Sequence, residues 1–176
     1  MCVGCDALES AADSARTEEP MIDLPEPGLY RTTQAMPGNE AAFPAGVLVY
    51  VGQQPNGGGR FIVRPGANRK NRWFWGEPTT ALRSPTWSNT LKRLPSEGFY
   101  TLPRTLELDG GGRWLANAIV QLGYNEQGSG IVFVAEQRDA EETNALFFSD
   151  RGVAIDDGLL ESLIWAPILP VRTNNE

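Results

Sequence analysis

Side chains that commonly carry catalytic chemistry are scarce in this chain of 176 residues. Histidine is absent, which excludes a histidine-assisted nucleophile, a histidine proton shuttle and a histidine metal ligand from within the chain. Lysine occurs only as Lys70 and Lys92. Neither lysine follows the GxxxxGK[ST] pattern of a phosphate-binding loop, and only these two could form a Schiff base. We therefore expect a protein that is not an enzyme and that uses no cofactor.

The two cysteines, Cys2 and Cys5, form a C-x-x-C motif at the start of the sequence. A tetrahedral zinc site needs four ligands, and no further cysteine or histidine exists to complete one. A thioredoxin-type motif opens a helix after a strand, and there is no room for a strand before Cys2. We therefore predict two free thiols and no metal site. A zinc ion shared by two chains, held by four pooled thiolates, is the alternative.

Pairs of acidic residues could hold a metal or perform acid–base catalysis. Asp156 and Asp157 are followed by Gly158 and lie between two short apolar runs, which predicts a hairpin turn. Glu141 and Glu142 stand in a polar stretch that is typical of a solvated loop, and no calcium-loop spacing occurs. Both pairs therefore favour turns and loops over a site.

Charge divides the chain into three parts. Residues 1–21 carry a net charge of −4, residues 22–95 one of +5 and residues 96–176 one of −8, which together give the total of −7. Such asymmetry bears on the partners of a protein more than on its fold. We therefore expect the one basic region to contact a partner.

This basic region interleaves cationic and aromatic side chains. We predict that its partner-binding residues are Arg60, Arg64, Arg69, Lys70, Arg72, Trp73 and Trp75. Arginine pairs with carboxylates or phosphates, and exposed aromatic rings stack on the bases of single-stranded nucleic acid. Side chains alternate along a strand, so either Trp73 and Trp75 or Phe74 alone would face solvent. Protein contact, nucleic-acid contact and an ordinary solvated basic face all remain open.

An internal repeat is visible in the sequence, because five segments recur in the same order with their apolar character retained. Gly28–Tyr30 matches Gly98–Tyr100 at an offset of 70, and Val49–Gly52 matches Val120–Gly123 at an offset of 71. The other matches pair 57–63 with 128–134, 73–75 with 146–148 and 94–95 with 169–170, at offsets of 71, 73 and 75. We interpret this order as the duplication of one unit, with offsets that drift upward through small insertions.

Each unit is expected to be built from strands, because its apolar runs are short, rich in β-branched and aromatic residues and separated by turn residues. The predicted strands span 28–33, 47–52, 60–64, 72–75 and 91–94, then 118–122 and 131–136. A glycine-rich loop joins two of them as a hairpin in each unit. Such strands after a G-[LF]-Y opening are similar to a partly open SH3-like barrel. The predicted fold is therefore mainly β, with two tandem SH3-like barrels at 25–95 and 96–176.

The repeat also predicts a core of paired positions, one set in each unit. The expected core residues are Tyr30, Val49, Val51, Ile62, Phe74, Tyr100, Val120, Leu122, Phe133 and Phe147. Each of the first five occupies a place equivalent to one of the last five.

Residues 1–24 precede the repeats and are expected to form an arm with a short amphipathic helix. Ala7, Leu8, Ala11, Ala12 and Ala15 share one face at helical spacing. A helix this short is marginal in water unless it docks. We predict that Leu8, Ala11 and Ala12 contact a partner; docking on the chain's own barrels and a frayed arm are the alternatives.

Together these features predict a non-enzymatic interaction or assembly protein, for example a subunit of a multiprotein machine or of a phage virion. A nucleic-acid-binding module that uses the basic unit is one alternative, and a small acidic inhibitor that mimics nucleic acid is another. The sequence shows neither a membrane-length apolar run nor a basic leader with an apolar core. We therefore expect a cytoplasmic protein, or one in a viral particle assembled in the cytoplasm, with a protein partner or self-association.

Overall fold

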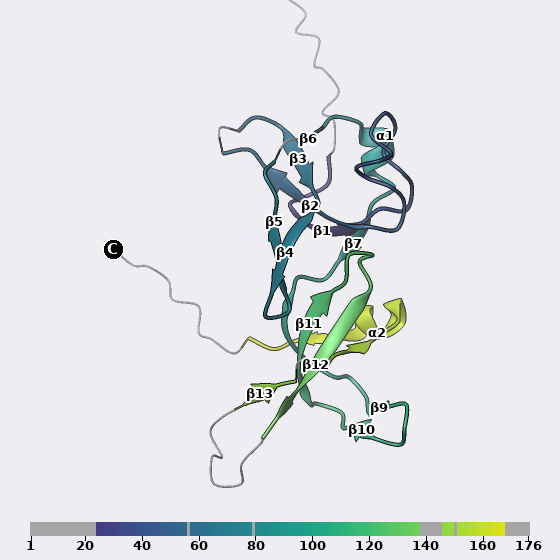
Figure 1. Ribbon diagram of the computed structural model, residues 1–176, viewed down its shortest axis with the longest axis vertical. Helices are drawn as coiled ribbons and strands as arrows, with labels where there is room; N and C mark the ends of the chain where they lie inside the picture. The colour runs from purple at the N-terminus through teal and green to yellow at the C-terminus, as the bar shows by residue number, and fades with distance from the viewer. Residues whose placement is uncertain (1–23, 56, 79, 138–145, 150, 168–176) are drawn as a thin grey trace, which may run out of the picture.

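The computed structural model describes residues 24–55, 57–78, 80–137, 146–149 and 151–167. Within these residues the chain is mainly β, with several antiparallel sheets (Figure 1). Residues 1–23 of the predicted arm, which include Leu8, Ala11 and Ala12, lie outside the described residues, as do Cys2 and Cys5. No helix in the described part of the chain is long and apolar enough to cross a membrane.

The first sheet has five strands in the order β6-β3-β2-β1-β7. Its strands are β1 (Gly28–Arg31), β2 (Leu48–Gln53), β3 (Arg60–Val63), β6 (Thr80–Leu82) and β7 (Lys92–Leu94). The short helix α1 (Pro85–Ser88) precedes β7, and the Ser84 side chain caps it by accepting from the amide of Trp87. Strands β4 (Pro65–Arg69) and β5 (Arg72–Trp75) form a separate hairpin.

The second sheet has the order β13-β12-β11-β8-β15, with β14 also paired to β12. Its strands are β8 (Gly98–Thr101), β11 (Ile119–Tyr124), β12 (Gly130–Glu136), β13 (Phe147–Phe148), β14 (Val153–Ala154) and β15 (Ile164–Trp165). The helix α2 (Asp157–Ser162) precedes β15. Strands β9 (Leu106–Glu107) and β10 (Arg113–Trp114) form a second small hairpin.

The two sheets share one strand order, since β6-β3-β2-β1-β7 corresponds to β14-β12-β11-β8-β15. Their registers agree: Tyr30 lies opposite Val49, and Tyr100 lies opposite Val120. Each sheet also has a short capped helix before its last strand. The hairpin turn predicted at Asp156, Asp157 and Gly158 is wrong, because the Asp156 carboxylate accepts from the amide of Leu159 and caps the start of α2.

The register corrects two of the five repeat matches. Val51 pairs with Ile62, and Leu122 pairs with Val132, so β3 and β12 correspond at an offset of 70 and not 71. The hairpin loop is thus one residue shorter in the second unit. Leu94 lies opposite Leu29, and the amide of Ala166 donates to the Phe99 carbonyl, so 94–95 corresponds to 166–167 and not to 169–170. The offsets do not drift steadily upward.

No closed barrel is found in the described residues, and the expected tandem SH3-like barrels are not confirmed. Strands β6 and β7 end the first sheet on opposite edges without pairing to each other among the described residues. The strand pair that could continue the sheet, β4 and β5, instead projects as a hairpin towards the second sheet (Figure 1). The observed architecture is two open antiparallel sheets with two accessory hairpins.

The core prediction is confirmed at eight of ten positions: the described core contains Tyr30, Val49, Val51, Ile62, Tyr100, Val120, Leu122 and Phe133. Phe147 is only half-buried. The prediction for Phe74 is wrong, because this side chain is 51% exposed. Strand β5 turns Trp73 and Trp75 inward, where both pack against the buried cluster, and alternation then places Phe74 on the solvent side.

The buried side chains form two clusters, and one of them joins the two sheets. The face of the first sheet that bears Tyr30 packs against Trp87 of α1 and against Phe43 of the loop between β1 and β2. The other face of the first sheet contributes Leu29, Leu48 and Leu94 to the buried cluster that also contains the core residues of the second sheet. The first sheet is therefore buried on both faces, and the boundary expected at residue 95 passes through a shared core.

Candidate functional site: a basic hairpin seated on the second sheet

The β4–β5 hairpin carries five of the ten predicted site residues, and three of these five lie at its tip (Figure 1). Arg69 pairs with Arg72, and Lys70 and Asn71 form the two-residue turn between them. Both turn residues have positive φ, 53° and 62°, as the type I′ turn requires. A lysine in this left-handed region is uncommon and is retained only where the surroundings hold it.

Contacts with the second sheet hold the hairpin tip in place. The Gln121 amide donates to the Lys70 carbonyl at 3.2 Å and accepts from the Asn71 side chain at 3.3 Å. The Trp73 indole donates to the Tyr124 carbonyl at 2.7 Å. Gly123 allows this approach, because a Cβ there would lie 2.8 Å from the Asn71 carbonyl oxygen.

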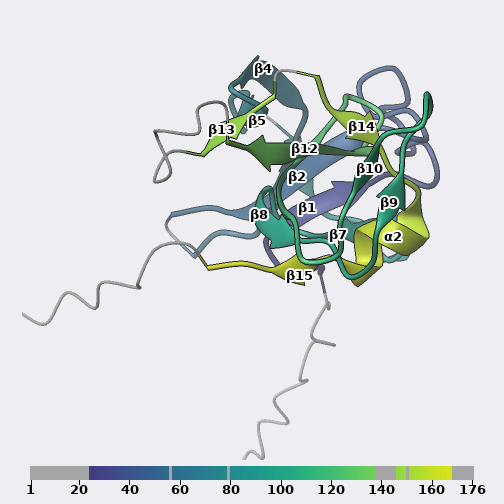
Figure 2. The ribbon, with the colours of Figure 1, turned by 90° about the horizontal axis from the view of Figure 1, so that it is seen from below.

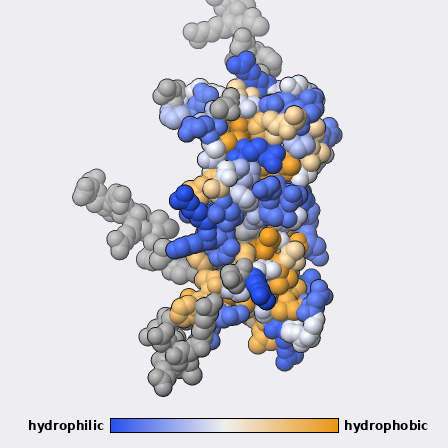
Figure 3. Space-filling model, viewed as in Figure 1, coloured by the Kyte–Doolittle hydropathy of each residue, from blue (hydrophilic) through white to orange (hydrophobic). Residues whose placement is uncertain are grey.

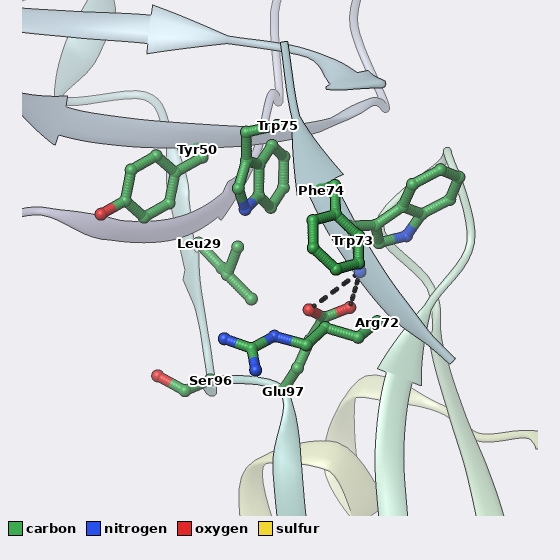
Figure 4. Close-up of a pocket in the computed structure, with 8 residues that line it drawn as sticks. All are labelled: Leu29, Tyr50, Arg72, Trp73, Phe74, Trp75, Ser96 and Glu97. Carbon is green, nitrogen blue, oxygen red and sulfur yellow. Dashed lines mark hydrogen bonds between the residues drawn. The ribbon is translucent and has the colours of Figure 1, made fainter. Parts of the chain in front are cut away.

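Glu97 lies beneath the hairpin, in the connection between β7 and β8 (Figure 4). Its carboxylate accepts from the backbone amide of Trp73 at 3.2 and 3.3 Å. Burial raises the pKa of Glu97 to about 7, against the smaller opposing effects of that amide and of the Arg72 charge. The pKa of Glu97 therefore lies near neutral pH, at a point where both sheets and the hairpin meet.

Two cavities meet at Glu97. One has a volume of about 410 Å³ and lies against Leu29, Tyr50 and Trp75 of the first unit (Figure 4). Tyr50 and Trp75 stack within it, with ring centroids 5.4 Å apart. The other, about 550 Å³, lies between the hairpin tip and the second sheet and is lined by Arg69, Lys70, Asn71, Arg72, Phe74, Glu97, Gly98, Phe99, Gln121 and Leu122. We call this second cavity the hairpin groove.

Two groups of cations in the basic unit differ in their ion pairs. Arg31 pairs with Asp157 at 2.5 Å, and Lys92 pairs with Asp157 and Glu161, both at 2.9 Å. These ion pairs join the first sheet to α2, and they lower the pKa of Asp157 to about 2. The second group consists of Arg69, Lys70 and Arg72, which form no salt bridge with any described residue. Arg69 instead lies 5.5 Å from the centre of the Phe74 ring.

The structure separates the predicted cationic site residues into three places, whereas the predicted Trp73 and Trp75 pack inward against the buried cluster. Arg60 lies on β3, where it contacts Gln53 and pairs with Glu26 at 3.7 Å. Arg64 donates to the Ala42 carbonyl at 3.0 Å. Arg69, Lys70 and Arg72 share the hairpin tip, and we call these three, together with the exposed ring of Phe74, the hairpin patch.

Sequence reasoning missed two members of this site. The repeat predicts Phe74 in the core as the equivalent of Phe147, while alternation along β5 allows either Trp73 and Trp75 or Phe74 to face solvent. Glu97 was missed because its significance comes from burial under a hairpin more than twenty residues away, at Trp73. The carboxyl group of Glu97 becomes buried only because the hairpin folds onto the second sheet.

Comparison with known proteins identifies no relative, since no family model, no curated protein and no solved structure matches the chain. The site is therefore interpreted from its own geometry. Among the described residues, no group of three or more cysteines and acidic residues could hold a metal ion. The hairpin patch combines fixed positive charge with an exposed ring and an adjacent groove, an arrangement suited to binding.

Proposed function

We propose that this chain is a non-enzymatic protein-binding or assembly protein whose hairpin patch contacts an acidic surface of another protein. The observation that carries the proposal is that Arg69, Lys70 and Arg72 form no salt bridge with any described residue, whereas Arg31 and Lys92 do. The turn that presents the three cations is held by Gln121. A preorganised cationic surface loses little conformational entropy on binding.

The hairpin groove supports the same proposal. Phe74 is 51% exposed at its rim, and aromatic and arginine side chains are enriched at protein interfaces. Phe99 and Leu122 give the groove an apolar floor. We infer that an acidic segment with one apolar side chain fits it, with the carboxylates on the arginines and the apolar group beside Phe74.

Nucleic-acid binding is the second candidate function, favoured by the combination of arginines and an aromatic ring. It is the weaker candidate, because Trp73 and Trp75 pack inward and leave Phe74 alone as a stacking surface on the hairpin. The net charge of −7 also opposes a polyanion at long range.

The finer description of the fold belongs to the same proposal. We infer that the two units are copies of one ancestral SH3-like unit, because strand order, register and helix position correspond between them. The arm residues Leu8, Ala11 and Ala12 are proposed to add apolar contact to the bound partner. Deletion of residues 1–20 is then expected to weaken binding without unfolding the sheets.

The experiment measures binding of fluorescent acidic peptides, each with one phenylalanine or leucine, and of single-stranded thymidine oligonucleotides. We expect the peptides to bind and the affinity to fall as salt rises. Arg69→Glu with Arg72→Glu is expected to abolish binding. Arg83→Glu with Arg104→Glu is the matched control, since it changes the net charge equally at exposed positions away from the hairpin. Oligonucleotide binding without peptide binding would favour the second candidate, and equal effects of both double variants would contradict the proposal.

A further inference from the structure

The cavity of about 410 Å³ that lies against the first unit has mostly aromatic walls, and we call it the aromatic cavity. Tyr50, Trp73, Phe74 and Trp75 line it together with the buried Leu29. Tyr50, Trp73 and Trp75 are half-buried and packed against the shared core cluster, whereas Phe74 is exposed. The faces of aromatic rings carry negative partial charge and attract cations, quaternary ammonium groups among them. These walls therefore favour a ligand that carries an organic cation.

One carboxylate, that of Glu97, lines the aromatic cavity. It accepts from the backbone amide of Trp73 and forms no salt bridge with any described residue. The cations that pair with Asp157 meet it at α2, which lies on the opposite side of the molecule from the β4–β5 hairpin (Figures 1 and 2). Burial of a carboxylate without an ionic partner is unfavourable. A cationic ligand beside Glu97 would supply that partner.

The cationic group of the same cavity is Arg72, which lies with Ser96 and Glu97 on the side away from the stacked rings of Tyr50 and Trp75 (Figure 4). Arg72 and Ser96 are exposed, so this side of the cavity is open to solvent. Hydrophilic residues gather at the level of the β4–β5 hairpin in Figure 3. Although both line the cavity, Arg72 and Glu97 form no salt bridge with each other. The guanidinium of arginine matches the geometry of a carboxylate or a phosphate.

We propose that the aromatic cavity binds a zwitterion in which a quaternary ammonium group is joined to a phosphate or a carboxylate. The ammonium group lies against the aromatic walls and beside the Glu97 carboxylate, and the anionic group lies on Arg72 at the open side. A cation without an anionic group meets the uncompensated charge of Arg72, and an anion without an ammonium group meets that of Glu97. A ligand with both groups compensates both charges and matches the zero net charge of this pair of side chains.

The test is isothermal titration calorimetry of the full chain with glycerophosphocholine, at about pH 8, where Glu97 is charged because its pKa is about 7. We expect saturable binding. Choline lacks the phosphate and glycerol phosphate lacks the ammonium group, so each is expected to bind at least about tenfold more weakly. Vesicles of phosphatidylcholine present the same group on a lipid. Co-sedimentation with these vesicles, in addition to binding of glycerophosphocholine, assigns a lipid headgroup as the source, and its absence assigns a free ligand.

Two variants test the roles of the charged side chains. Glu97→Gln is expected to weaken binding of glycerophosphocholine at least about tenfold, because it removes the charge beside the ammonium group. Glu77→Gln, on an exposed loop, is its control. Arg72→Gln is expected to abolish the preference for glycerophosphocholine over choline, because only the phosphate contacts Arg72. Arg69→Gln is the matched control, since Arg69 lies on the same hairpin but does not line the aromatic cavity.

The comparison of the three ligands uses the wild-type chain and needs no variant, and a thermal melt shows whether each variant is folded. No saturable binding of glycerophosphocholine, equal binding of choline or glycerol phosphate, or equal effects of a variant and its control would each overturn the inference. The inference goes beyond the proposed function, although Arg72 and Phe74 belong to both sites. Binding of glycerophosphocholine by a chain that binds no acidic peptide would support this inference and contradict the proposed function.

Discussion

At the scale of single residues, the aromatic side chains of β5 show how burial is decided by neighbours. Trp73 and Trp75 pack against the shared core cluster, whereas Phe74 between them is 51% exposed and lies beside Arg69. Its repeat equivalent, Phe147, is half-buried. Phenylalanine is therefore buried to different extents at two corresponding positions, so its contribution to the free energy of unfolding depends on its neighbours.

Phe74→Ala is expected to lower the free energy of unfolding by no more than about 1 kcal/mol, since an exposed ring loses little besides its contact with Arg69. Phe133→Ala is the matched change in the core, where Phe133 is 7% exposed, and it should cost about 3 to 5 kcal/mol. Chemical denaturation of both variants checks the prediction. If Phe74→Ala lowered the free energy of unfolding as much as Phe133→Ala does, Phe74 would have to be a buried core residue.

Glu97 provides a prediction about pH at the same scale. Its pKa is about 7 in the folded chain against an ordinary value of 4.5, so the folded state holds its proton more tightly than the unfolded state does. This contribution to stability is complete below about pH 4.5 and is lost as pH rises through about 7. Above neutral pH, the unfavourable burial of the charged carboxylate remains.

Glu97→Gln removes this titration and keeps an oxygen that can accept from the Trp73 amide. The variant is therefore expected to gain stability relative to the wild type between about pH 5 and about pH 8. Denaturant unfolding at these two pH values measures the gain, with Glu77→Gln on an exposed loop as the control. A stability difference between Glu97→Gln and the wild type that does not change with pH would contradict the burial of this carboxyl group.

At the scale of elements, the β4–β5 hairpin is a strap between the two sheets. It leaves the first sheet after β3, and its tip rests on β11 through Gln121 and Gly123. The positive φ of Lys70 and Asn71 matches the twist of the flanking strands. The hairpin patch is therefore presented by a rigid element whose position depends on a close backbone approach.

Gly123→Ala tests this dependence, because its Cβ would lie 2.8 Å from the Asn71 carbonyl oxygen. The hairpin must then move, at a cost of about 1 to 3 kcal/mol, and the indole of Trp73 would lose its bond to Tyr124. We expect a lower melting temperature together with a changed tryptophan emission. Gly112→Ala is the control, since its Cβ would meet Leu108 at an ordinary 3.4 Å. Equal behaviour of the two variants would show that the hairpin does not rest on β11.

At the scale of the whole molecule, the two units are joined by both core and charge. Leu29, Leu48 and Leu94 pack into the cluster of the second sheet, and Tyr124, whose burial raises its pKa, donates to the Pro95 carbonyl at 2.8 Å. Asp157 accepts from Arg31 and Lys92 across the same boundary. The positive and negative parts of the chain thus neutralise each other in part within one molecule.

We therefore expect one cooperative unfolding transition for both units, seen at the same midpoint by tryptophan fluorescence and by far-ultraviolet circular dichroism. Asp157→Asn should lower this midpoint modestly and do so less at high salt, because its partners are partly exposed and screened. Asp109→Asn, in the exposed β9–β10 loop, is the control. Two separate transitions would show that the units fold independently.

The sequence alone determined features that depend on local periodicity and on residue types. Strand β5 begins and ends where predicted, at Arg72 and Trp75, and the offsets of 70 and 71 align β1 with β8 and β2 with β11. Alternation of apolar residues and turn-forming glycines is recorded in the chain itself, so these elements could be read before any packing was known. The absence of histidine likewise needed no structure.

Tertiary structure decided which side of each element faces a neighbour. Alternation allows two orientations of β5, and only the shared core beneath Trp73 and Trp75 selects the one that exposes Phe74. The pairing of Lys92 with Asp157, the pKa of Glu97 and the absence of closed barrels in the described chain all depend on contacts between residues far apart in sequence. Burial and Coulomb energy depend on distances in space, which the order of residues does not contain.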